Sequence, residues 1–176
     1  MYNIVLRYSK AWFEQAVSMG TMQIVLEDAR LITLVLQENL DLRQLLKNPV
    51  VPNLQKQEIL QEIFAKHWHA GTQEFIHLLL QAGRIELLGE ICRAYEKAYF
   101  KHEGIVEVQI TSAVALLEDN KERINLALQK NGFSKMQTSY QIDSSLIGGF
   151  VIGIAGKQLN QSVKHKLKEI EKQIKN

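Results

Sequence analysis

The spacing of the apolar residues changes near Gly104, and this change most constrains how the 176-residue chain can fold. Up to about Glu103, apolar residues recur three and four positions apart, which is typical of helices with one face turned inward. After Gly104 the segment IVEVQIT alternates apolar and polar residues, which is typical of a strand with one face in water. We therefore expect an α+β chain with two domains, residues 1–104 and 105–176.

The first domain is predicted to be a bundle of six short helices, because the links between its periodic segments are only a few residues long. Asn53 is expected to cap the fourth helix and Thr72 the fifth, and Gly83 is expected to end the fifth. The first helix carries one apolar stripe, formed by Val5, Tyr8, Trp12, Ala16 and Met19.

The second domain is predicted to be a small strand-helix-strand-strand-helix unit. The strands are expected in IVEVQIT, KMQTSYQI and FVIGI, and the helices in KERINLALQKNG and SVKHKLKEIEKQIKN. The last helix has apolar residues in 4-3-4 steps under a coat of lysines. It suits either packing on its own sheet or pairing with a partner helix, since a coiled-coil seam uses the same spacing.

Composition favours a globular protein, with 46% apolar and 23% charged residues. The single cysteine, Cys92, cannot form an internal disulfide, which favours a reducing compartment. The start MYNIVLRYSK lacks a signal peptide, and no apolar run reaches about 18 residues, so we expect a cytosolic, soluble chain. The net charge of +2 is too small to require a nucleic acid. An RNA-binding adaptor that uses the more basic second domain remains an alternative, and its RNA affinity would fall steeply with salt.

No nucleotide, metal or catalytic motif is complete. Gly156 and Lys157 would end a P-loop, but Val151 stands where its first glycine belongs and Gln158 replaces the hydroxyl residue. His67 and His69 are two positions apart and cannot share a metal ion on a helix. We predict no catalytic residue, cofactor or metal; an enzyme whose site is assembled from distant residues stays open as an alternative.

The segment FIHLLL, residues 75–80, has more apolar residues than one inward stripe requires. Either the fifth helix is buried on all sides, or it has a spare apolar face. A spare face beside another helix is how amphipathic partner helices are bound.

The segments RYSKAWFEQA, LLKNPVV, LLLQAGRIELLGEI and ITSAVAL follow one another along the chain, which then continues with IDSSLIGGFVIGIAGKQLNQSVKHKL. In sequence and order they resemble the motifs of the delta subunit of F-type ATP synthase, the oligomycin-sensitivity-conferring protein of mitochondria. The resemblance covers essentially the whole chain. It departs at Gly153, where the family often has arginine, and at Asn160, where it has aspartate, which puts in doubt any salt bridge formed there.

The last motif contributes the family residues Asp143, Leu146, Gly148, Gly149 and Ser162. Asp143 is expected to form a turn, the two glycines a close backbone approach at a strand junction, and Ser162 a helix cap.

The resemblance implies a non-catalytic peripheral-stalk subunit, or stator. Its six-helix domain would bind the N-terminal helices of the alpha subunits in a groove between the first and fifth helices. Matched by motif or adjacency, the groove residues would be Tyr8, Ala11, Gln15, His77, Leu78, Gln81 and Ala82.

The resemblance further implies that the C-terminal unit holds the C-terminal ends of the b-type stalk subunits. The catalytic head would then not turn with the rotor during proton-driven ATP synthesis. The implied place is the cytoplasmic face of the bacterial inner membrane, peripheral through the complex, with no nucleic acid and no small-molecule substrate as partner.

Overall fold

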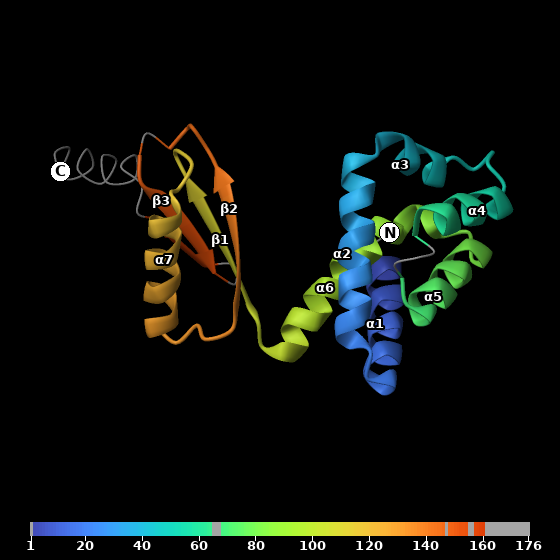
Figure 1. Cartoon of the computed structure of the whole chain (residues 1–176), viewed down its shortest axis with the longest axis horizontal. Coiled ribbons are helices and arrows are strands. Elements are labelled where there is room, and N and C mark those ends of the chain that lie inside the picture. Colours follow the sequence, from blue (N-terminus) through green and yellow to red (C-terminus); the bar gives the residue numbers. More distant parts are fainter. Residues whose placement is uncertain (1, 65–67, 147, 155–156, 161–176) are drawn as a thin grey trace. The chain divides into compact units, whose positions relative to one another are not determined.

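The computed structural model describes residues 2–64, 68–146, 148–154 and 157–160, with side chains from residue 3 to residue 154. The chain divides into two compact units, Met1–Tyr99 and Phe100–Asn176 (Figure 1). The division falls within a helix, a few residues before the expected boundary at residue 104.

The first unit is helical, as the three- and four-residue spacing predicts. A short 3-10 turn, Ile85–Leu87, precedes the sixth helix. The six α-helices are α1 (Tyr2–Met19), α2 (Met22–Glu38), α3 (Leu40–Lys47), α4 (Asn53–Phe64), α5 (Ala70–Gln81) and α6 (Leu88–Glu103).

Glycines with positive φ end three of these helices, and Gly104 (φ 66°) follows α6. Gly20 (φ 68°) follows α1, and Gly83 (φ 63°) follows α5, as predicted. At the second turn the N–H of Arg84 donates to Leu79 O at 2.8 Å, which satisfies a carbonyl that the helix end would leave unpaired.

The starts of two helices differ from the prediction. The N-cap of α5 is His69, whose Nδ1 accepts from the N–H of Gly71 at 3.1 Å, whereas Thr72 lies buried within the first turn. Asn53 does not cap α4; its Nδ2 donates to Leu80 O at 2.7 Å and ties the start of α4 to the end of α5.

The core of the first unit centres on aromatic residues. Trp12 and Tyr95 are almost completely buried, and the Tyr95 hydroxyl donates to Met22 O at 3.1 Å. Ile32, Leu79 and Ile91 fill the space around them. Met19, predicted in the inward stripe of α1, is 56% exposed, because it lies in the last turn, where the chain bends at Gly20.

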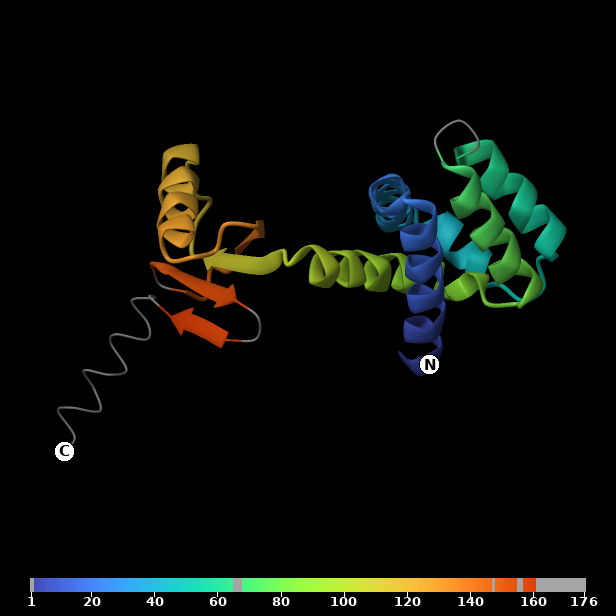
Figure 2. The same cartoon turned by 90° about the horizontal axis from the view of Figure 1, so that it is seen from below.

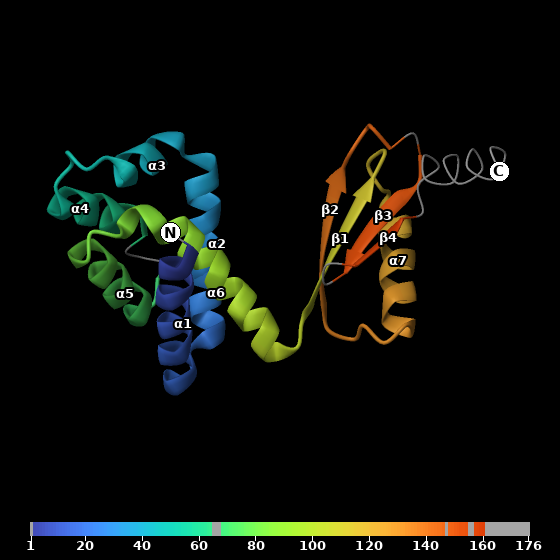
Figure 3. The same ribbon diagram turned by 180° about the vertical axis from the view of Figure 1, so that it is seen from behind.

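The second unit contains a four-stranded mixed sheet and one described helix, α7 (Glu118–Lys130). The strands are β1 (Val106–Ser112), β2 (Met136–Ile142), β3 (Phe150–Ile154) and β4 (Lys157–Asn160). Their order is β2-β1-β3-β4; β1 and β2 run parallel, and the other pairs are antiparallel (Figure 3).

The α+β class is confirmed, and β4 is an addition to the predicted order of elements. This strand was missed because KQLN has four residues and one apolar side chain, too short for an alternating pattern. The helix predicted near the C-terminus, with its cap Ser162, lies outside the described residues.

Helix α7 covers one face of the sheet (Figure 2). Its Leu128 packs with Val108 and Ile110 of β1 and Ile152 of β3, the buried positions of their strands. The alternation of IVEVQIT therefore predicted correctly that Val108 and Ile110 face the core while Glu107 and Gln109 face outward.

The junction between β2 and β3 forms a turn, as predicted for Asp143. Its Oδ1 accepts from the N–H of Ser145 at 2.9 Å, and its carbonyl accepts from Leu146 at 3.1 Å. Gly149 has φ 80°, a conformation that favours glycine, and its carbonyl accepts from Ala113 at 3.4 Å. Gly148 immediately precedes it, so this stretch is a strand junction.

At the two departures from the family motif, Gly153 lies in β3 opposite Gln109 and Gln158, and Asn160 ends β4 opposite Val151. A Cβ at Gly153 would be 3.8 Å from its nearest neighbour, Gln109 O, which is ordinary contact. The sheet therefore has room for a side chain at this position.

Candidate partner-binding groove

Helices α1 and α5 are joined by a stacked aromatic pair. The rings of Trp12 and Phe75 lie 4.4 Å apart between centroids with an angle of 3° between their planes. The ring of Tyr95 in α6 also packs against Trp12, with 4.7 Å between the ring centroids. Stacking of this kind holds the two helices together through their side chains.

The three α1 residues predicted for the groove are neighbours of Trp12 along the helix. Tyr8, Ala11 and Gln15 are three and four residues apart and flank the buried Trp12. Ala11 is exposed, whereas Tyr8 and Gln15 are half-buried. The Arg7 guanidinium lies 5.6 Å from the centre of the Tyr8 ring, a cation–π contact that restrains the tyrosine.

On α5, Leu78 is the exposed apolar residue of the proposed groove. It lies one turn after Phe75 and is 48% exposed. Gln81 and Ala82 follow at the end of the helix and are also exposed. The exposed Leu78 beside the stacked rings is an apolar surface that an amphipathic helix can cover.

A small hollow of about 10 Å³ lies between α1, the start of α2 and the start of α5. Gln15 lines it together with Met19 and Gly71, two residues that the sequence did not indicate as site residues. Met19 was expected in the inward stripe of α1, and its position four residues after Gln15 could have identified it as a neighbour of the groove residues. The hollow has room for about one water molecule, so it can accept only the tip of a partner side chain.

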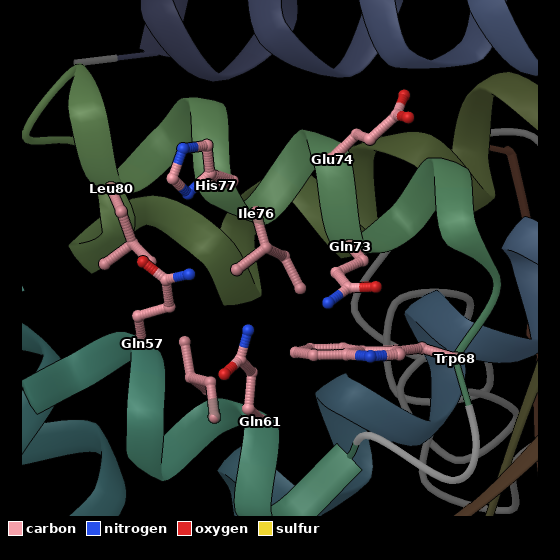
Figure 4. A pocket seen from close by; sticks show the side chains of 9 residues that line it. Gln57, Gln61, Trp68, Gln73, Glu74, Ile76, His77 and Leu80 are labelled. Atoms are coloured by element: carbon pink, nitrogen blue, oxygen red, sulfur yellow. The ribbon is translucent and has the colours of Figure 1, made fainter. Parts of the chain in front are cut away.

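The opposite side of α5 faces α4 and encloses a larger pocket of about 210 Å³. Leu60 of α4 and Ile76 and Leu80 of α5 form its apolar lining, and Trp68 extends between Gln61 and Gln73 (Figure 4).

His77 lines this second pocket, and its Nε2 lies 2.9 Å from Gln81 Nε2. The structure therefore places His77 with the residues that face α4, apart from the residues that flank Trp12.

These contacts account for the apolar surplus of FIHLLL. Phe75 packs towards α1, Ile76 and Leu80 line the pocket beside α4, and Leu79 is completely buried. Leu78 alone among these apolar residues is largely exposed. Helix α5 thus buries one side of its surface, and Leu78 is the exposed apolar residue on the other side.

Within the described residues, no three histidine, cysteine or acidic side chains converge to hold a metal ion. His69 acts as a helix cap, and His67 lies outside the described residues. Burial raises the pKa of the Cys92 thiol to about 12, so this cysteine is protonated and unreactive at neutral pH. No helix in the described part of the chain is long and apolar enough to cross a membrane.

The family residues of the second unit are grouped at one place in the fold. Asp143, Leu146, Gly148 and Gly149 form the connection from β2 to β3, beside the end of β1. The Asp143 carboxylate accepts from the N–H of Ser145, and the backbone hydrogen bonds of Asp143 and Gly149 join this connection to the end of β1.

A unit of six helices followed by a small αβ unit with a four-stranded mixed sheet defines the class of a two-unit α+β protein. A model of the ATP synthase delta (OSCP) subunit family matches residues 4–174, and the chain belongs to this family. It is a peripheral-stalk subunit of F-type ATP synthase, a structural component and not a catalyst.

Curated relatives match almost the full length of the chain. It is 33% identical over 172 residues to ATP synthase subunit delta of Lactobacillus gasseri, covering 97% of this chain and 94% of that protein. It is 30% identical over 177 residues to the same subunit of Moorella thermoacetica, covering 98% and 97%.

A solved structure has the same fold. One chain of the mitochondrial ATP synthase hexamer of Toxoplasma gondii superposes with a TM-score of 0.77 and 18% identity, covering 98% of this chain and 97% of that one.

Proposed function

We propose that the first unit binds N-terminal helices of the alpha subunits and that the second unit binds the C-terminal ends of the b-type stalk subunits. The chain would thereby hold the catalytic head against the torque of the rotor during proton-driven ATP synthesis. In bacteria this places it at the cytoplasmic face of the inner membrane, attached through the complex.

The observation that carries the head-binding proposal is the exposed Leu78 beside the Trp12–Phe75 stack. An incoming amphipathic helix would cover Leu78 and contact Tyr8 and Ala11 on the opposite wall. Burying a large apolar side chain contributes about 1.5–3 kcal/mol, and a central anchor of this kind dominates the affinity of an interface.

We expect Leu78→Asp and Tyr8→Asp each to weaken binding to the isolated catalytic head at least about tenfold, because each places a charge in an apolar interface. Affinity is measured by isothermal titration calorimetry, and folding of each variant by circular dichroism. Leu34→Asp on α2 is the matched control, since Leu34 is 51% exposed and Leu78 48%. Equal affinity for Leu78→Asp and Leu34→Asp would refute the groove assignment.

The stalk-binding proposal rests on exposed apolar residues at one end of the sheet. Ile142 ends β2 directly opposite Ser112, the last residue of β1, and Val114 and Leu117 follow β1. All three apolar side chains are at least 65% exposed. Such a cluster is suited to the apolar stripe of a stalk helix.

A further inference from the structure

A pocket of about 150 Å³ opens between α2, α3 and the start of α6, apart from the proposed groove. Its floor is apolar and buried, formed by Leu36, Leu46, Ile85 and Leu88. At Gly89 the backbone of α6 lies against this floor, since a Cβ there would be 3.4 Å from Leu36 Cδ1.

Five charged side chains line the same pocket. Arg43 and Lys47 come from α3, Arg93 comes from α6, and Glu86 and Glu90 flank the start of α6. None of the five forms a salt bridge with another side chain in the part of the chain that the structure describes. With three cationic and two anionic side chains, the lining carries one net positive charge.

Among these charged residues, Arg43 has a buried hydrogen-bond donor without an acceptor in the described structure. Its side chain is half-buried, and its Nε–H is fully buried without a hydrogen-bond acceptor in the described structure. A buried donor without an acceptor destabilises the folded chain, the more so when the group is charged. The first turn of the 16-residue helix α6 lies at the same pocket and adds positive potential.

We propose that this pocket binds a carboxylate carried on an aliphatic stem. The guanidinium of Arg43 would bind the carboxylate oxygens, and Lys47 and Arg93 would add attraction. The stem would lie on the floor of leucine and isoleucine side chains. An acidic side chain of a partner chain and a free dicarboxylic acid share this chemistry.

The direct test is a titration of the ¹⁵N-labelled full chain with glutarate, followed by NMR. Each arginine Nε–H gives its own signal, so Arg43 reports on the pocket, and Arg84, an exposed arginine after α5, is the internal control. We expect saturable shifts at Arg43 Nε–H and at the amides of residues 88–90, and none at Arg84. Absent or non-saturating shifts at Arg43, or equal shifts at Arg84, would overturn the proposal. Saturation with inorganic phosphate but not with glutarate would also overturn it.

Two substitutions sharpen this test. Arg43→Lys keeps the charge but removes the guanidinium fork, and we expect at least about tenfold weaker glutarate binding, whereas Arg84→Lys has no effect. Glu86→Gln removes a competing carboxylate, and we expect binding to tighten roughly twofold to fivefold. Misfolding would weaken glutarate binding, so tighter binding by Glu86→Gln cannot result from misfolding. Unchanged affinity in both pocket variants contradicts the assignment.

The source of the carboxylate is tested in the intact complex with a carbodiimide, which joins an amine to a nearby carboxylate. A crosslink from Lys47 to an acidic residue of another subunit supports a partner side chain. Crosslinks confined to Glu86 and Glu90, together with saturable glutarate binding, support a free dicarboxylate. Leu78→Asp should leave the glutarate titration unchanged, so this proposal and the head-binding proposal can fail separately.

Discussion

Cys92 lies on α6 in the core of the first unit, where burial raises the pKa of its thiol from 9.0 to about 12. Burial, together with the neighbouring Tyr99, also raises the pKa of the Tyr95 hydroxyl. Both groups hold their protons in the folded chain at pH values at which the unfolded chain releases them.

The free energy of unfolding therefore falls as pH rises above the pKa of the unfolded chain. Below about pH 9 the Cys92 contribution to stability is fully present, and between pH 9 and 12 we expect the free energy of unfolding to fall by up to about 1.4 kcal/mol per pH unit. Urea unfolding at pH 8, 9.5 and 10.5 measures this slope. Cys92→Ala should be less stable at pH 8 but should show a shallower slope, with Tyr95 supplying the remainder. Identical slopes in the two proteins would contradict this account.

Asp28 shows how one buried carboxylate orders neighbouring elements. It lies on α2, and its Oδ2 accepts from the N–H of His69 at 2.8 Å and from Thr72 Oγ1 at 2.5 Å. Both donors belong to the start of α5, so the carboxylate also complements the positive end of that helix. This contact fixes the start of α5, the helix that carries Leu78, against α2.

We expect Asp28→Ala to lower the free energy of unfolding by about 3 kcal/mol, because it leaves two donors at the start of α5 without an acceptor. Asp28→Asn keeps one oxygen acceptor and should cost less. The control is Asp41→Ala, which removes an exposed aspartate from the first turn of α3. Urea denaturation at pH 7 compares the three variants. A loss for Asp28→Ala no larger than that for Asp41→Ala would rule out the network as a major contributor.

The helices of the first unit were predictable because their inward stripes are long and glycines such as Gly20 and Gly83 mark their ends. Local contacts that depend on the tertiary fold were not. His69 replaces Thr72 as the cap of α5 because Asp28, 44 residues before Thr72, binds the threonine hydroxyl. No local pattern contains that partner.

In the candidate groove, too, contacts between residues distant in sequence could not be predicted. The exposed position of Leu78 was suggested by a surplus of apolar residues, and the family motif indicated Tyr8. The stacking of Trp12 on Phe75 joins residues far apart in sequence, so periodicity alone could not predict it. His77 was placed by adjacency to Leu78, but neighbouring residues on a helix point about 100° apart, and the structure turns it towards α4.

At the scale of the whole molecule, the two units differ in the size of their described cores. The buried cluster of the first unit contains both Trp12 and Tyr95, whereas the described cluster of the second consists of Val108, Ile110, Leu128 and Ile152. A unit of about 70 residues buries only roughly 60% of the surface of its unfolded chain. We therefore infer that the second unit is the less stable one.

We expect two thermal transitions in the isolated chain, with the second unit unfolding at the lower temperature. Both tryptophans, Trp12 and Trp68, belong to the first unit, so tryptophan fluorescence should follow only the upper transition. Calorimetry should detect both. A chain that ends at residue 104 should keep the upper transition, and a single transition by both methods would show that the units unfold together.

The strand order carries a consequence for synthesis of the chain. Strand β1 lies inside the sheet but is the first of the four strands to leave the ribosome. Val108 pairs with Thr138 on one side and Ile154 on the other, so both edges of β1 remain open until dozens more residues have been made. An unpaired apolar strand is a template for wrong pairing. The second unit is therefore completed late, and the nascent chain is most prone to aggregate while the ribosome translates the segment between β1 and β3.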